Sequence, residues 1–90
     1  MPRTTKSATF SSLLGRQLRS HRRSLRLSQA EVARRLGVST TYVQNVEAGR
    51  CNITVGQLAR ICEALGAFPH VDLVPLELNL DGPIPLLAEV

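Results

Sequence analysis

The chain has 90 residues, of which 43% are hydrophobic and only 3% aromatic, and its net charge is +4 at neutral pH. This length suits one small domain, and the composition indicates an aliphatic core of Leu, Val, Ile and Ala. No apolar run approaches the roughly 20 residues of a membrane span, and none follows Met1 as in a signal peptide, so we expect a soluble, cytoplasmic protein.

The N-terminal region is predicted to contain an arm and one helix. Residues 1–10 show no apolar periodicity, and we interpret them as a flexible basic arm. Apolar residues then recur at helical spacing from Phe10 to Leu25. This pattern predicts a first helix from about Ser11 to Ser24.

Three further helices are marked at both ends. Each begins after a Ser or Thr that can cap a helix N terminus, and each ends before a glycine suited to the left-handed conformation. The caps are Ser28, Ser39 and Thr54, and the glycines are Gly37, Gly49 and Gly66. Glu31 and Gln57 stand where a capping box needs an acid or amide. The predicted helices are about 29–36, 40–48 and 55–65.

The two short helices 29–36 and 40–48 are separated only by Gly37-Val38-Ser39. Two helices joined by a tight turn containing glycine are typical of a helix-turn-helix unit. Any small helical bundle also has short turns, so the turn alone does not identify a helix-turn-helix unit. The surface of the second helix provides the further evidence.

The second helix of this unit has an unusual polar face. At about 100° per residue, uncharged polar side chains gather on one side, and Tyr42, Val43 and Val46 gather on the other. The polar residues are Thr40, Thr41, Gln44 and Asn45. Asn and Gln can pair with adenine edges in a major groove, and Thr can bond a base or touch the thymine methyl. A solvated face is the alternative, but Lys, Glu and Ala would form a better helix there.

Three residues around this face are candidates for phosphate contacts. Ser39 stands at the start of the second helix, Gln29 at the start of the preceding one, and Arg50 follows the final glycine. Glu47 falls on the border between the polar face and the core, where a carboxylate needs a partner. We expect that partner to be Arg22 on the first helix.

Charged and sulfur-containing residues narrow the class of protein. Residues 1–27 carry only basic charges, which would favour binding to a polyanion, although a solvated helix face explains them equally well. Residues 67–90 carry only acidic charges. Cys51 and Cys62 provide neither a disulfide framework nor a metal site, and we place Cys62 in the core and Cys51 in a loop. No nucleophile–base or metal-ligand spacing is present, so we expect no enzyme, no cofactor and no metal.

The segment LSQAEVARRLGVS, from Leu27 to Ser39, together with VEAGR, from Val46 to Arg50, closely resembles the lambda-repressor-like, or Xre-type, helix-turn-helix family. The resemblance covers roughly residues 11–66. It implies a mainly α fold, a compact four-helix domain that binds operator DNA as a homodimer. Carried over, it gives Gln29 and Ser39 as phosphate contacts and Arg22 with Glu47 as a structural ion pair. It also gives four base contacts: Thr40, Thr41, Gln44 and Asn45.

Residues 67–90 are predicted to form a C-terminal tail. Residues 71–80 alternate apolar and polar on both sides of Pro75, which predicts a short β-strand with the proline at an edge or bulge. A lone strand is not stable, so we expect it to pair across a homodimer. The predicted dimer contacts are Val71, Leu73, Leu76 and Leu78. The apolar end, 84–90, either folds back onto the dimer or anchors a partner protein.

This arrangement, a strand after a four-helix Xre-type domain, resembles that of antitoxins of the HipB type. That resemblance implies a repressor of its own operon that also binds a toxin. The sequence therefore predicts a dimeric, sequence-specific repressor acting on a palindromic operator, as the antitoxin of a toxin–antitoxin operon. The alternative is a protein-interaction module that neutralises a toxin or enzyme through its tail.

Overall fold

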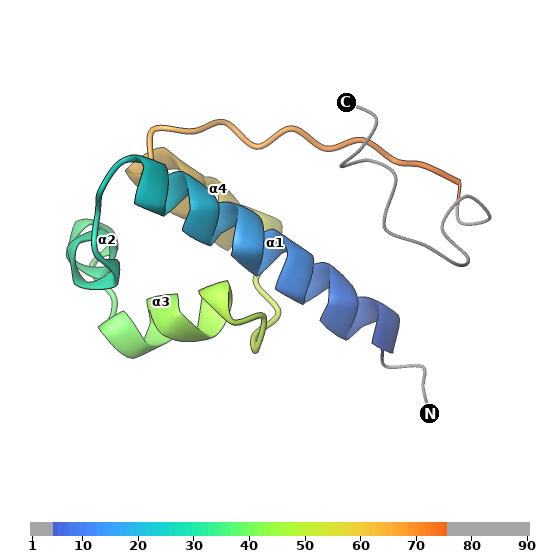
Figure 1. Cartoon of the computed structure of the whole chain (residues 1–90), viewed down its shortest axis with the longest axis horizontal. Helices are drawn as coiled ribbons and strands as arrows, with labels where there is room; N and C mark the ends of the chain where they lie inside the picture. Colours follow the sequence, from blue (N-terminus) through green and yellow to red (C-terminus); the bar gives the residue numbers. More distant parts are fainter. Residues whose placement is uncertain (1–4, 76–90) are drawn as a thin grey trace.

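The computed structural model describes residues 5–75, with side chains from Phe10 onward. Four helices form the described part of the chain (Figure 1): α1 (Thr5–Ser24), α2 (Gln29–Leu36), α3 (Thr40–Glu47) and α4 (Val55–Ala64). Residues 5–75 contain no strand. The predicted mainly α, four-helix fold is therefore confirmed.

Helix α1 differs from its prediction at one end. It begins at Thr5 rather than near Ser11, so residues 5–10 of the predicted arm are helical, and it ends at Ser24 as expected. The chain then turns through Arg26, whose φ of 60° lies in the left-handed region. The first turns of α1 are rich in Thr and Ser. These residues are polar and have modest helix propensity, so neither apolar periodicity nor propensity predicts a helix start there.

The ends of α2, α3 and α4 lie within one residue of the predicted ones. Ser28, Ser39 and Thr54 each accept a hydrogen bond from a backbone N–H in the first turn of their helix. The three predicted glycines all have positive φ, at 73°, 75° and 64° for Gly37, Gly49 and Gly66. The helix limits were predictable because short-range hydrogen bonds and backbone sterics determine them.

Of the two predicted capping boxes, only one is complete. Gln57 returns a bond to the Thr54 N–H at 2.7 Å and closes the box at α4. At α2 the Ser28 hydroxyl accepts from the Glu31 N–H at 3.0 Å, but the Glu31 carboxylate pairs with Arg34 one turn ahead. The charged guanidinium is a stronger partner for a carboxylate than the N–H of Ser28, so the box at Ser28 stays half-formed.

The core is aliphatic, as the composition predicted, and all four helices contribute to it. Its centre is formed by α2 and α3, with α1 packed mainly on α3 and α4 mainly on α2. The buried residues are Leu18, Val32, Ala33, Leu36, Val43, Val46, Ile61, Cys62 and Leu65. Cys62 is buried as expected, and Cys51 is a half-buried free thiol in the α3–α4 loop.

Two arginines join α2 to α4. Arg35 of α2 donates to the carbonyl of Ala64, at the end of α4, at 3.1 Å. Arg60 of α4 donates to the carbonyl of Leu36, at the end of α2, also at 3.1 Å. The last carbonyls of a helix lack intrahelical partners and lie at the negative end of its dipole, so each arginine stabilises the other helix.

Beyond α4 the chain continues as a coil through residues 67–75 (Figure 1). Ala67 is held to the domain by its N–H, which donates to the Cys62 carbonyl at 2.8 Å. The described half of the predicted strand, 71–75, makes no strand pairing within this single chain. The other half, 76–80, lies outside the described residues.

Candidate nucleic-acid interface

The connection between α2 and α3 is a tight, hydrogen-bonded turn. Gly37 adopts the left-handed conformation, and the Val38 N–H donates to the Ala33 carbonyl at 3.0 Å. Val38 is half-buried against the core, and Ser39 then caps α3 by accepting from the Tyr42 N–H at 3.1 Å. The turn therefore fixes the direction in which α3 leaves α2, as the helix-turn-helix pattern requires.

Helix α3 has two distinct sides. Val43 and Val46 are buried in the core, and Tyr42 is half-buried at its edge. The opposite side carries the four predicted base contacts: Thr41 and Gln44 are exposed, and Thr40 and Asn45 are half-buried. The structure thus brings these polar side chains onto one accessible surface, which we call the α3 polar face.

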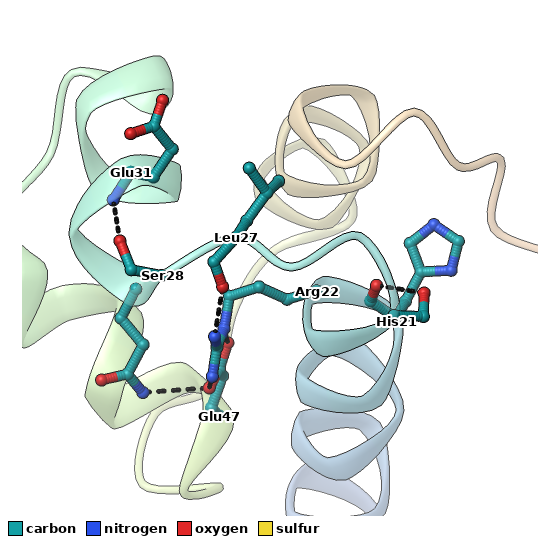
Figure 2. Close-up of polar contacts among 8 residues, drawn as sticks. His21, Arg22, Leu27, Ser28, Glu31 and Glu47 are labelled. Carbon is teal, nitrogen blue, oxygen red and sulfur yellow. Dashed lines mark hydrogen bonds and ion pairs between the residues drawn. The ribbon is translucent and has the colours of Figure 1, made fainter.

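At one border of the α3 polar face, Arg22 and Glu47 form a buried ion pair (Figure 2). Nε and Nη2 of Arg22 donate to the two carboxylate oxygens of Glu47 at 2.7 and 3.0 Å, and Nη1 donates to the Leu27 carbonyl at 2.6 Å. Only 7% of Arg22 and 8% of Glu47 remain exposed. The pair ties α1 to α3 and, through Leu27, to the turn before α2.

Gln29 completes this network from α2. Its side-chain amide donates to Oε1 of Glu47 at 3.0 Å, so three helices meet at one carboxylate. Burial by itself would raise the pKa of the Glu47 carboxyl, but the bonds from Arg22 and Gln29 outweigh it, and the pKa lies below its ordinary value. Glu47 is therefore ionised at neutral pH, and its charge is neutralised inside the fold.

The three predicted phosphate contacts lie in different settings. Ser39 and Arg50 are exposed at opposite ends of α3. Gln29 is half-buried and already uses one amide N–H for Glu47, which leaves its second N–H for an outside acceptor.

Arg50 and Asn45 are linked, a contact that the sequence did not suggest. Nη1 of Arg50 donates to Oδ1 of Asn45 at 3.3 Å, and the Arg50 N–H donates to the Asn45 carbonyl at 2.9 Å. The second contact belongs to the left-handed turn at Gly49 that ends α3. The predicted glycine stop is thus the reason that Arg50 folds back beside the α3 polar face.

Gly15 is another residue whose importance the sequence reasoning missed. A Cβ at Gly15 would lie 2.5 Å from the Glu47 carbonyl oxygen and 2.6 Å from that of Val46. Only glycine therefore lets α1 approach the end of α3 this closely. The available signal was a glycine inside a predicted helix, where it costs roughly 1 kcal/mol relative to alanine and implies a compensating contact.

The predicted dimer contacts divide between two parts of the chain. Val71 and Leu73 are exposed and belong neither to the core nor to the residues packed against it, with Leu73 92% exposed. Leu76 and Leu78 lie outside the described residues. Phe68, just after α4, is also 92% exposed, so the start of the tail presents apolar side chains to its surroundings.

Residues 5–75 contain neither a candidate metal site nor a candidate membrane-spanning helix. No group of three or more His, Cys, Asp or Glu gathers there in a way that could hold a metal ion. No helix in this part of the chain combines the length and the apolar character needed to cross a membrane.

A capped α2, a tight turn and an α3 with a polar outer face define a helix-turn-helix domain of the DNA-binding class. Comparison with known families agrees: the family described as "Helix-turn-helix domain" matches residues 13–76. The chain belongs to this family, which confirms the lambda-repressor-like resemblance. The relatives are described as transcriptional or gene regulators, a class of protein that is normally not enzymatic.

Individual relatives show the same class. The uncharacterized HTH-type transcriptional regulator y4dJ of Sinorhizobium fredii is 42% identical over 62 residues, which cover 69% of this chain and 79% of the relative. The clp gene regulator ClgR of Corynebacterium glutamicum superposes with a TM-score of 0.62 and 37% identity, covering 63% of this chain and 73% of that one. The restriction-modification controller protein C.AhdI of Aeromonas hydrophila superposes with a TM-score of 0.64 and 28% identity, covering 67% of this chain and 91% of that one.

Proposed function

We propose that this protein is a sequence-specific repressor that inserts α3 into the major groove of an operator. The observation that carries the proposal is the α3 polar face, because Thr, Gln and Asn side chains can bond base edges. Thr40, Thr41, Gln44 and Asn45 are the base contacts in this account. Ser39, Arg50 and the free N–H of Gln29 bind the flanking phosphates and fix the register of the helix.

We also infer that the repressor acts as a homodimer on a palindromic operator. The exposed apolar residues Val71 and Leu73 support this, since single-chain packing leaves them in solvent. Pairing of the tail strands of two copies would cover them, together with Leu76 and Leu78. A two-fold dimer would then place two copies of α3 about one helical turn apart on one face of the DNA.

Selection of binding sites from a random duplex library tests both statements. The proposal expects an enriched inverted repeat whose half-sites are centred about 10 base pairs apart, or a multiple of that spacing. Recovery of sequences without any common motif contradicts specific binding. A single unpaired half-site contradicts the dimer but not the base contacts.

The tail supports a second role, as the part of an antitoxin that binds a toxin protein. Phe68 is 92% exposed and lies outside the strand proposed for the dimer, so it would stay available to a partner protein. In this proposal the protein represses its own operon through α3 and neutralises its partner through the tail. The alternative is that partner binding is the main function and that DNA binding is secondary.

Truncation after Ala67 separates these roles, because it keeps the Ala67 contact that closes α4. The dual role expects the truncated protein to stay folded, to keep weak monomeric DNA binding and to lose partner binding. The test partner is the product of the gene directly adjacent to this one. If the full-length protein binds that product but shows no sequence preference on DNA, the interaction module is the correct account.

A further inference from the structure

Helix α1 carries three arginines that form no ion pair with the described residues and are not among the proposed contacts of α3. Arg16, Arg19 and Arg23 are all exposed, and we call them the arginine stripe. In the described part of the chain no carboxylate pairs with them, whereas Arg22 pairs with Glu47 and Arg34 with Glu31. Three unpaired charges on one helix repel each other, so their clustering favours an anionic partner.

The helical spacing places the arginine stripe on one side of α1. At about 100° per residue, its three members fall within an arc of about 60°. Gly15 and Ser12, which border or interrupt this arc, are the residues that meet the end of α3: Gly15 faces the carbonyls of Val46 and Glu47, and Ser12 lies against Gly49. The stripe is therefore on the flank of α1 nearest α3.

The other flank of α1 faces α4. His21, roughly opposite the stripe, makes a 3.1 Å hydrogen bond with the carbonyl of Leu65. Arg19 is also close enough to the Glu47 carboxylate for its charge to help lower the pKa of that group. Both observations place the stripe beside the Arg22–Glu47 border of the α3 polar face rather than on the back of the domain.

We propose that the arginine stripe binds DNA phosphates beside the groove that α3 enters, as a second contact line outside that of Ser39 and Arg50. This rests on the proposed function, since it assumes that α3 faces DNA. At 1.5 Å per residue, Arg16 and Arg23 are about 10 Å apart along α1. One DNA strand presents a phosphate about every 3.4 Å along the helix axis, so with α1 parallel to that axis the stripe spans about three phosphate steps.

The test compares two double variants with the same change of charge. Arg16→Gln/Arg19→Gln removes two arginines of the stripe. Arg34→Gln/Arg35→Gln removes two exposed arginines in the last turn of α2. Glutamine keeps the helix propensity of arginine, and the Arg35 bond to Ala64 that the control loses is exposed, so both variants should fold, and circular dichroism verifies this. Fluorescence anisotropy then measures affinity between 50 and 200 mM salt for the duplex that the wild type selects and for a random duplex.

Each phosphate contact contributes about 0.9 to the slope of log affinity against log salt. The stripe variant should therefore flatten the slope by about 1.8 on both duplexes, so that the wild type loses about tenfold more affinity than the variant over this range. The variant in α2 should keep the wild-type slope. An unchanged slope in the stripe variant, or an equal change in the α2 variant, overturns the proposal.

The same data separate this proposal from the proposed function. If the wild type binds the selected duplex no better than the random one, specific repression is contradicted, and the slope on the random duplex still judges the stripe. If the wild type is specific and the stripe variant keeps its slope, α3 remains the recognition helix and only the stripe is excluded.

Discussion

At the scale of single residues, the Glu47 carboxylate holds the helix-turn-helix in place. It accepts from Arg22 on α1 and from Gln29 on α2, while its own backbone belongs to α3. The requirement for a partner was predictable from the position of Glu47 on the border of the core. The third bond of Arg22, to the Leu27 carbonyl, was not, because it depends on how the α1–α2 turn folds.

Replacing Glu47 with alanine is expected to lower the free energy of unfolding by about 3 kcal/mol. The reason is that Arg22 would stay buried without a counter-charge. Thermal and urea denaturation measure the change, and Glu63→Ala, which removes an exposed carboxylate of α4, serves as the control. A Glu47→Ala protein that melts like the control would remove the ion pair from this account.

The lowered pKa of Glu47 also predicts a pH dependence. Its unfolded-state pKa is about 4.3, and the folded value is lower, so the unfolded chain binds more protons between the two. The stabilisation is thus fully present above about pH 4.3 and is lost as the pH falls through the folded pKa. Melting temperatures from pH 3 to 6 should show a shallower acid decline for Glu47→Gln than for the wild type. Parallel declines would contradict the assignment.

Arg50 contacts Asn45 and is also a proposed phosphate ligand, and its removal distinguishes the two roles. As a phosphate ligand, Arg50→Ala should weaken binding to selected and random duplexes alike and flatten the salt slope by about 0.9. Arg34→Ala is the matched control, since Arg34 pairs only with Glu31 on its own helix. A loss confined to the selected duplex would instead make Arg50 a positioning residue for Asn45.

At the scale of helices, the ends were predictable and the close contacts were not. Caps and left-handed glycines act over a few residues, so α2, α3 and α4 could be placed from the sequence. The start of α1 at Thr5 lacks an apolar pattern, and it was placed too late. The approach of α1 to α3 at Gly15 involves residues far apart in the chain, which no local pattern encodes.

Two glycine-to-alanine changes in helices are expected to act in opposite directions. Gly15→Ala should destabilise the fold by about 1–3 kcal/mol, because the added methyl would meet the backbone carbonyls of Val46 and Glu47. Gly56→Ala in α4 should stabilise it by up to about 1 kcal/mol, since its nearest neighbour would be the Thr54 hydroxyl at 3.8 Å. Chemical denaturation measures both, and stabilisation by Gly15→Ala would show that the helices are not held this closely.

At the scale of the whole molecule, the domain could be predicted from one chain, whereas the tail could not. The aliphatic core, the four helices and the α3 polar face follow from residues within one chain, and the sequence predicted them. The strand at residues 71–80 needs a partner that one chain does not provide. In the described part of this segment, Val71 and Leu73 are exposed. Dimerisation therefore stays a prediction, which the site-selection experiment tests.

The central claim is that α3 contacts bases through its polar face. Its most direct test is the affinity of Asn45→Ala, against the wild type, for the selected duplex and for a random duplex at one salt concentration. Asn45 is half-buried and lies outside the core, so the variant should fold normally. The account predicts a loss of about 1–3 kcal/mol on the selected duplex, relaxed preference at one base pair and no change on random DNA. An equal loss on both duplexes would contradict it.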